Sequence, residues 1–330
     1  MVTMQEVADA AEVSIATVSR VLRDQPNVRP EVRAHVLKVV EELGYRMNRT
    51  ARRLRTQTSG VIGLLVSDIR NPFFTDIARA IEDVAHQNDL SVFLCNTDED
   101  PEKEIHYLNT LIDEGVDGII LSPTPSQAKH FQMIMEHPTP IVFIDRRIDG
   151  LDADTVLSDN FDSAYTITSH LIERGCQRIG AVIGMSESTT GRERMAGYKS
   201  CLEENKQVPL SAFVLPHEEN AEKIVTDWLQ SNSPPDAILT GNSRLTIGAL
   251  NAIKQHGLSI PDDILLAGFD ETVWMHHIGN GITVVSQPTY EMGRNAAELL
   301  LQRLKDHDRP AREVILKGKL IERGSTATAD

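Results

Sequence analysis

Apolar residues recur at helical spacing in two short segments within Val2–Leu22, at the start of the chain. Thr3 and Ser14 directly precede these segments, and both are residue types that cap helix N-termini. Glu6 lies three residues after Thr3 and completes a capping-box pattern. Two helices this short are not stable alone, so they need a third helix to close a core. Arg29–Leu43 supplies it, and the segment is therefore predicted to be a helix-turn-helix domain.

From Gly60 onward the pattern changes to short apolar runs that alternate with longer amphipathic segments. This alternation is typical of a parallel sheet with helices on both faces, and it occurs twice, so we expect two doubly wound α/β lobes. The predicted strands are Val61–Val66, Ser91–Cys95, Gly118–Ser122, Pro140–Ile144, Arg178–Ile183, Ala212–Leu215, Ala237–Thr240 and Ile264–Phe269. The predicted helices are one from the Asn71-Pro72 pair to about Asn88, then Pro101–Glu114, Gln127–Glu136, Phe161–Arg174, Arg192–Glu204, Ala221–Gln230 and Leu245–Gln255.

Length and composition agree with a globular protein of two or three domains: 330 residues, 41% hydrophobic and 25% charged. The chain has no apolar run long enough to cross a membrane and no basic-then-apolar start, so we expect a cytoplasmic protein. Its three cysteines (Cys95, Cys176 and Cys201) are far apart, which favours free thiols and offers no metal-ligand spacing.

The net charge of −15 conceals an uneven distribution. Residues 1–58 carry ten basic and seven acidic side chains, whereas the remainder carries 23 basic and 41 acidic ones. Five of the arginines fall between Arg46 and Arg55 without an intervening acid. A basic segment directly after a helix-turn-helix is suited to DNA phosphates, and the acidic remainder would stay off the DNA.

Five motifs, in this order and spacing, resemble the LacI/GalR family of lactose and galactose repressors. They are A-T-V-S-R-V-L at Ala16–Leu22, V-R-P-E-V-R-A-H-V-L at Val28–Leu37, E-L-G-Y at Glu42–Tyr45, N-R-T-A-R-R-L at Asn48–Leu54 and G-V-I-G-L-L-V at Gly60–Val66. The resemblance implies a DNA-binding domain over residues 1–46, a hinge helix and linker over 47–59, and an effector-binding and dimerisation core of the periplasmic-binding-protein type over 60–330. Within that core it implies a first lobe of about 60–158 and 288–320, to which Tyr290–Asp306 and Glu313–Leu316 return, and a second lobe of about 159–287 and 321–330.

The resemblance also implies which residues read DNA. Ile15 and Ala16 would make apolar contacts with bases in the major groove, and Arg20 would bond a guanine. Leu54 would wedge into a base step from the minor groove, on a hinge helix over Asn48–Arg55 that folds only on the operator. The remaining positions would be Thr3, Ser14, Thr17, Ser19, Asn27, Arg49 and Arg52, with Thr17 and Ser19 on phosphates.

Ligands of such sheets bind beyond the carboxyl ends of the strands, in the cleft between two lobes. The resemblance places effector-binding residues at Phe73, Phe74, Asp145, Phe161, Thr190, Arg194, Asn242, Asp270 and Gln287, and Ser188 precedes a helix at the same edge. Carboxylate, guanidinium and amide groups bond ring hydroxyls, and aromatic faces stack on C–H surfaces, so this set suits a sugar or a sugar derivative. The choice between a neutral sugar and a sugar acid stays open.

The sequence therefore predicts a homodimeric repressor that binds double-stranded operator DNA and is released by a sugar, with no cofactor, metal or membrane partner. Ser188 stands where the family's purine-binding member carries Arg, which makes a purine less favoured. A corepressor-dependent regulator, of the purine or phosphoprotein type, stays open as an alternative, as do a periplasmic-type sugar-binding protein and a sugar-modifying enzyme. The chain contains no phosphate-binding, dinucleotide, nucleophile-elbow or zinc-protease motif, so no catalytic residue is predicted.

Overall fold

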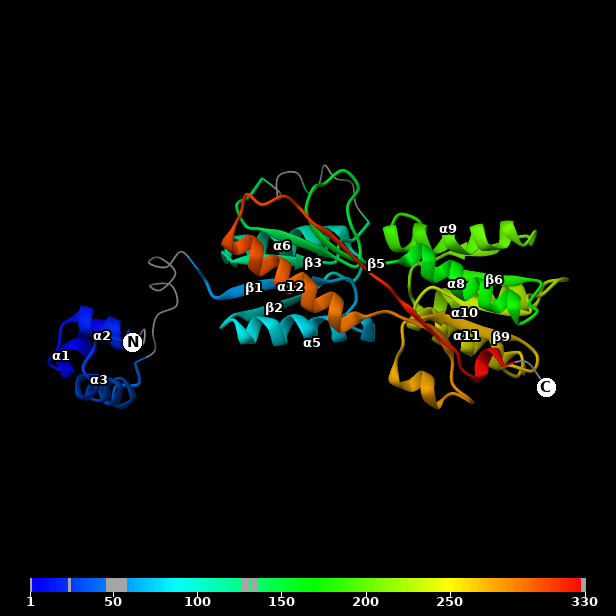
Figure 1. The fold of residues 1–330 in the computed structure, drawn as a ribbon. Helices are drawn as coiled ribbons and strands as arrows, with labels where there is room; N and C mark the ends of the chain where they lie inside the picture. Colours follow the sequence, from blue (N-terminus) through cyan, green and yellow to red (C-terminus); the bar gives the residue numbers. More distant parts are fainter. Residues whose placement is uncertain (1, 23–24, 46–57, 126–130, 132–135, 328–330) are drawn as a thin grey trace. The chain divides into compact units, whose positions relative to one another are not determined.

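The computed structural model describes residues 2–22, 25–45, 58–125, 131 and 136–327. The chain divides into two compact units, Met1–Ser59 and Gly60–Asp330. The first unit holds helices α1 (Met4–Ala10), α2 (Ile15–Leu22) and α3 (Pro30–Glu42) (Figure 1). Their apolar faces meet in a small core of Val7, Ala8, Ala11, Val18, Val21, Val36 and Val39. This confirms the three predicted helices and explains why none of them needs to be stable alone.

The larger unit contains two lobes, each built on a sheet of six described strands. The first sheet is entirely parallel and has the order β11-β5-β4-β3-β1-β2. Side chains alternate across it, so that Ile62 and Leu64 pack on α5 and α12 while Leu65 packs on α6. Its elements are β1 (Val61–Val66), α5 (Pro72–Gln87), β2 (Ser91–Asn96), α6 (Pro101–Asp113), β3 (Gly118–Leu121), β4 (Ile141–Ile144), β5 (Asp154–Ser158), α12 (Thr289–Lys305) and β11 (Glu313–Leu316).

The second sheet repeats this plan with the order β12-β10-β9-β8-β6-β7, and β12 is antiparallel to β10. Helices α8 and α9 cover one face and α10 and α11 cover the other. Its elements are α8 (Asn160–Glu173), β6 (Ile179–Ile183), α9 (Thr189–Glu204), β7 (Leu210–Phe213), α10 (Glu218–Leu229), β8 (Ala237–Thr240), α11 (Ser243–Gln255), β9 (Leu265–Phe269), β10 (Thr283–Ser286) and β12 (Lys319–Ile321), with short 3₁₀ helices at Val273–His277 and Gly324–Thr326.

The chain crosses between the lobes after β5, after β10 and between β11 and β12 (Figure 1). Because β11 belongs to the first sheet and α12 packs on it, the C-terminal part of the chain is shared by both lobes. Lys319 and Leu320 pair with β10, so the second sheet begins slightly before the expected boundary at residue 321. The carboxyl ends of the parallel strands of both sheets face the space between the lobes.

Most predicted elements are present, with their ends shifted by at most three residues. Helix α9 begins at Thr189 instead of the predicted Arg192, because Ser188 caps it and turns the chain earlier. Strands β5, β10 and β12 were missed: β5 and β10 begin with a buried Asp and a buried Thr, so they lack a continuous apolar run. The predicted helix Gln127–Glu136 lies almost wholly outside the described residues.

Candidate functional site

The residues predicted to contact bases lie on the exposed face of α2, with Ile15 and Ala16 in its first turn and Arg20 in its last. Ile15 is 43% exposed, and Ala16 and Arg20 are also exposed, while Val18 and Val21 of the same helix are buried. The small core takes up the opposite face of the helix, which leaves Ile15, Ala16 and Arg20 on its solvent-exposed face. This surface is therefore available to a partner.

The capping residues of this unit are engaged in local hydrogen bonds. The Ser14 hydroxyl accepts from the Thr17 backbone N–H at 3.2 Å, and the Thr3 hydroxyl accepts from the Glu6 N–H at 3.2 Å. The Glu6 carboxylate accepts in return from the Thr3 N–H at 2.7 Å, and these bonds with Thr3 lower the pKa of Glu6. Ser19 is half-buried and Asn27 is exposed. The predicted contacts of Arg49, Arg52 and Leu54, with the hinge helix, lie outside the described residues.

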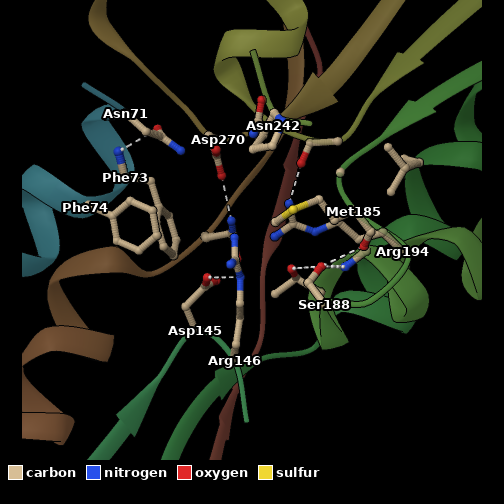
Figure 2. Close-up of a pocket in the computed structure, with 17 residues that line it drawn as sticks. Asn71, Phe73, Phe74, Asp145, Arg146, Met185, Ser188, Arg194, Asn242 and Asp270 are labelled. Carbon is tan, nitrogen blue, oxygen red and sulfur yellow. Dashed lines mark hydrogen bonds and ion pairs between the residues drawn. The ribbon is translucent and has the colours of Figure 1, made fainter. Parts of the chain in front are cut away.

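A cavity opens between the lobes of the second unit, at the carboxyl ends of both sheets (Figure 2). Its volume is about 40 Å³, so the side chains leave little free space between the lobes in this structure. Its walls come from loops after strands and from the first turns of α5, α9 and α11. The lining residues are Asn71, Phe73, Phe74, Asp145, Arg146, Ile183, Gly184, Met185, Ser188, Thr190, Gly191, Arg194, Pro216, Gly241, Asn242, Asp270 and Gln287.

Arg194 forms the positive centre of the second lobe's wall. Its Nε donates to Asn160 Oδ1 at 2.8 Å, and its Nη1 donates to the backbone carbonyl of Gly241. The guanidinium also lies 4.2 Å from the centre of the Phe269 ring. Burial lowers the pKa of Arg194, and Asp270 and Asp145 oppose that shift. Arg194 thus joins elements within its own lobe and also lines the cavity.

Two buried carboxylates contribute to the cavity wall, one from each lobe. Asp145 directly follows β4, and Asp270 directly follows β9. Burial raises the pKa of Asp145 to about 6, against the opposing effect of Arg146 and Arg194. Burial also raises the pKa of Asp270, which accepts a hydrogen bond from Gln287 Nε2 at 2.6 Å. The Gln287 carbonyl oxygen is buried without a hydrogen-bond partner, as expected of a group that awaits a ligand hydroxyl.

Arg146 lines the first lobe's wall and is held from behind by carboxylates. Its two Nη atoms donate to the two oxygens of Glu99, both at 2.7 Å. Burial disfavours the charge on Arg146, but Glu99 raises the pKa of Arg146 overall. Behind this pair Glu104 is fully buried and accepts from the Thr124 backbone N–H at 2.7 Å and from its hydroxyl at 2.8 Å. Burial raises the pKa of Glu104 to about 7, despite those two bonds.

The aromatic pair Phe73 and Phe74 forms an apolar wall in the first turn of α5. Both rings are buried and pack edge to face, with ring centres 5.0 Å apart. Asn71 caps this helix through Oδ1, which accepts from the Phe73 N–H at 3.1 Å. The same oxygen accepts from the Ser243 hydroxyl of the second lobe at 3.2 Å, so the cap also joins the lobes.

Ion pairs cross between the lobes at two places near the cavity. Asp68 of the first lobe accepts from Arg244 Nη1 of the second at 2.5 Å, and both side chains are at most 10% exposed. On the other side, Asp149 accepts from Arg192 at 2.6 Å, and Arg147 lies 3.2 Å from Glu193. The first of these pairs is buried, so it depends on the lobes being held this close together.

Nine of the ten predicted effector residues line this cavity: Phe73, Phe74, Asp145, Ser188, Thr190, Arg194, Asn242, Asp270 and Gln287. Phe161 does not. It lies in the first turn of α8, where its side chain is 41% exposed. The tight packing of α8 on Gly197 of α9 fixes that helix start, since a Cβ at Gly197 would lie 2.2 Å from the Phe161 carbonyl.

Two of the lining residues use their polar groups locally. The Ser188 hydroxyl donates to the Met185 carbonyl at 2.9 Å and accepts from the Gly191 N–H at 3.0 Å. Asn242 caps α11, because its Oδ1 accepts from the Leu245 N–H at 2.8 Å. Asn71, Met185 and Pro216 were not predicted as lining residues. Asn71 and Met185 lie within five residues of a strand's carboxyl end, and reading further into those loops would have found them.

Within the described part of the chain no three His, Cys, Asp or Glu side chains are placed to hold a metal ion. Among those residues no helix combines the length and apolar character needed to cross a membrane. All three cysteines are free; Cys176 and Cys201 are buried and Cys95 is partly buried. Burial raises the pKa of each thiol, which disfavours the thiolate form.

Comparison with known proteins matches both units. Residues 3–48 match the family of bacterial regulatory proteins of the lacI type, and residues 59–323 match the periplasmic binding proteins and sugar-binding domain of the LacI family. The chain is 35% identical over 326 residues to the ribose operon repressor of Halalkalibacterium halodurans, covering 99% of this chain and 97% of the relative.

Two solved structures are similar to this one. A lac repressor dimer bound to operator and an anti-inducer has a TM-score of 0.89 at 25% identity, and 99% of each chain is covered. A LacI family transcriptional regulator from Enterococcus faecium with bound ribose has a TM-score of 0.74 at 27% identity, covering 82% of this chain and all of the other.

Proposed function

Because the chain belongs to the LacI family of bacterial regulatory proteins, we propose that it represses transcription as a homodimer and is released from its operator by a sugar. It is a DNA-binding transcription regulator controlled by a small-molecule effector. D-ribose or a closely related pentose is the effector we favour. Such a protein acts where the DNA is, so we place it in the cytoplasm. The proposal assigns it no catalytic residue.

The observation that carries the sugar assignment is the composition of the inter-lobe cavity. Carboxylates from both lobes, Arg194, and the amides of Asn242 and Gln287 surround a space closed on one side by two phenyl rings. These groups offer several donors and acceptors around a small ring and an apolar wall for its C–H face. Two proteins similar to this chain are named for ribose or contain it, which narrows the choice among sugars.

The exposed face of α2 supports the DNA assignment. We infer that Ile15 and Ala16 contact base edges and that Arg20 bonds a guanine in the major groove. Phosphate contacts are assigned to Thr17 and Ser19. Under the same proposal Arg49, Arg52 and Leu54 bind the minor groove and the backbone.

The two edge strands β2 and β7 support the homodimer. Phe93 and Leu94 in β2 are 45% and 48% exposed, and Phe213 and Leu215 at β7 are 40% and 52% exposed. Exposed apolar residues along a sheet edge favour burial against another chain. Two-fold symmetry would then place two copies of α2 on the two halves of a near-palindromic operator.

The sugar can release the repressor from the operator only if it binds one arrangement of the lobes more tightly than the other. A sugar that bonds Asp145 of one lobe and Arg194 of the other binds best when the lobes are close. Closure would shift the first lobes of the dimer against each other and weaken the operator complex. By linkage, the operator should weaken sugar binding by the same factor.

Titration calorimetry and a gel-shift titration test the proposal together. We expect D-ribose to bind and to lower operator affinity, while purine bases do neither. Tight binding of a purine that raises operator affinity would instead support a corepressor. Turnover of the sugar, abolished in Asp270→Ala, would support an enzyme.

A further inference from the structure

Arg146 is the guanidinium on the first lobe's cavity wall, and three carboxylates surround it. Glu99 binds both Nη atoms at 2.7 Å, and Asp145 lies 3.4 Å from Nε. Glu104 lies behind them and also interacts electrostatically with Arg146. The carboxylates around Arg146 therefore carry more negative charge than is needed to neutralise its guanidinium. A cation compensated in this way attracts no anionic ligand.

Glu99 reaches this position through an uncommon backbone conformation. Asp98 and Glu99 both have positive φ, 55° and 59°, in the turn between β2 and α6. The Glu99 N–H donates to the Ser67 carbonyl at 3.2 Å, which holds the turn against β1. The Glu99 side chain is only 5% exposed, whereas that of Asp98 is 47% exposed and pairs with Lys103. The turn thus directs one carboxylate inward, behind the cavity, and its neighbour outward.

Arg194, the other guanidinium in the cavity wall, has a different environment. Arg194 bonds two neutral acceptors, Asn160 Oδ1 and the Gly241 carbonyl, and among the described residues no carboxylate forms an ion pair with it. Its charge is balanced across the cavity by Asp145 and Asp270. With Arg146 neutralised from behind, the cavity surface has one positive charge facing two carboxylates. A phosphate or carboxylate group would meet net repulsion as well as the loss of its own hydration.

We propose that Glu99 is a specificity-determining residue, which neutralises Arg146 so that the cavity accepts neutral sugars and rejects phosphorylated or acidic ones. This inference rests on the proposed function only in assigning the effector to this cavity. It decides between a neutral sugar and a sugar acid, a choice that the residues in sequence leave open. Glu99 acts through Arg146 and need not touch the ligand.

The substitution Glu99→Gln tests the inference, because it removes one negative charge and preserves the shape of the side chain. D-ribose, D-ribose 5-phosphate and D-ribonate are titrated by calorimetry into the full-length wild type and the variant. The wild type should bind D-ribose at least about 100-fold more tightly than either anion. In Glu99→Gln the affinity for the anions should rise by about tenfold or more relative to D-ribose. Asp98→Asn, the same change one residue earlier, should leave all three affinities unchanged.

A Glu99→Gln protein that is folded by circular dichroism yet gains no affinity for either anion overturns the inference, whether or not D-ribose binds. Comparable wild-type affinities for D-ribose and D-ribose 5-phosphate overturn it even if the variant does not fold. Absence of D-ribose binding in the wild type, with anion binding gained in Glu99→Gln, counts against ribose as the effector and supports the role of Glu99. In the double variant Glu99→Gln with Arg146→Gln the gain should disappear, since no uncompensated cation remains.

Discussion

Asp145 and Asp270 occupy equivalent positions in the two lobes: each is the first residue after a strand, and each has a left-handed backbone, with φ of 69° and 70°. Non-glycine residues seldom adopt this conformation, and those that do are concentrated at functional sites. Here the turn directs both carboxylates into one cavity, where each raises the cost of ionising the other. A ligand hydroxyl that donates to them would relieve part of that cost.

Effector affinity should depend on pH through Asp145. Its pKa in the free protein is raised to about 6 by burial, so protonation below pH 6 removes an acceptor for ligand hydroxyls. We expect the affinity for D-ribose to fall as the pH is lowered from 7.5 to 5, measured by calorimetry. Asp145→Asn should bind weakly and with less pH dependence. A flat wild-type profile over this range would contradict an ionised acceptor at this position.

Arg194→Ala should lose about 10- to 100-fold or more in effector affinity, because it removes charged hydrogen bonds inside a buried site. Operator binding without effector should be retained in a gel-shift titration. Lys199→Ala, on the exposed face of the same helix, is the control and should behave like the wild type. Induction of the Arg194→Ala variant at the usual sugar concentration would show that the effector binds elsewhere.

Glu104 should make the protein less stable as the pH rises. Its pKa is about 7 in the folded protein against an ordinary value of 4.5, so the folded state binds its proton more tightly. That contribution is fully present below pH 4.5 and is lost as the pH rises through 7. Thermal melts of Glu104→Gln should therefore match the wild type more closely at pH 5 than at pH 8. At pH 8 the free energy of unfolding of the variant should exceed that of the wild type by on the order of 2 kcal/mol. Glu102→Gln, exposed on the same helix, should show no such trend.

The buried pair of Asp68 and Arg244 should favour the closed arrangement of the lobes. Asp68→Asn and Arg244→Gln should each weaken effector binding by about tenfold or more, because each removes the buried ion pair between the lobes and leaves its partner with a more exposed ion pair only, Arg70 for Asp68 and Glu218 for Arg244. The double variant should lose less than the sum of the two single losses. Strict additivity in this double-mutant cycle would mean that the two side chains do not act together in binding.

Arg20→Ala should weaken specific operator binding by about 10- to 100-fold, the usual cost of one bidentate base contact. Effector binding should be unchanged, since Arg20 belongs to the other compact unit. Lys38→Ala is the control, because that exposed side chain only pairs with Glu42 on its own helix. Equal affinities of Arg20→Ala and the wild type for operator would remove Arg20 from the base-reading surface.

Local patterns were sufficient to predict most of the fold. The apolar periodicity of α2 and the apolar runs of β1 and β8 depend only on neighbouring residues, so they can be read without the tertiary structure. Strand β5 could not be predicted in this way. It begins at Asp154, which is buried only because Arg303 and Arg309 reach it from α12 and the loop that follows. Those partners lie about 150 residues further along the chain.

The candidate site, like the fold, could be predicted from the sequence only in part. The sequence determined much of the chemistry of the cavity, because its resemblance to a known family brought Asp145, Arg194 and Asp270 into the prediction, and residues after the ends of parallel strands meet at one edge. Only the tertiary structure decided which charges remain available there. The charges of Arg146 and Arg244 are both taken up by carboxylates: Glu99 neutralises the first, and Asp68 binds the second across the two lobes. Electrostatic compensation depends on distance in space, and no spacing along the chain reveals it.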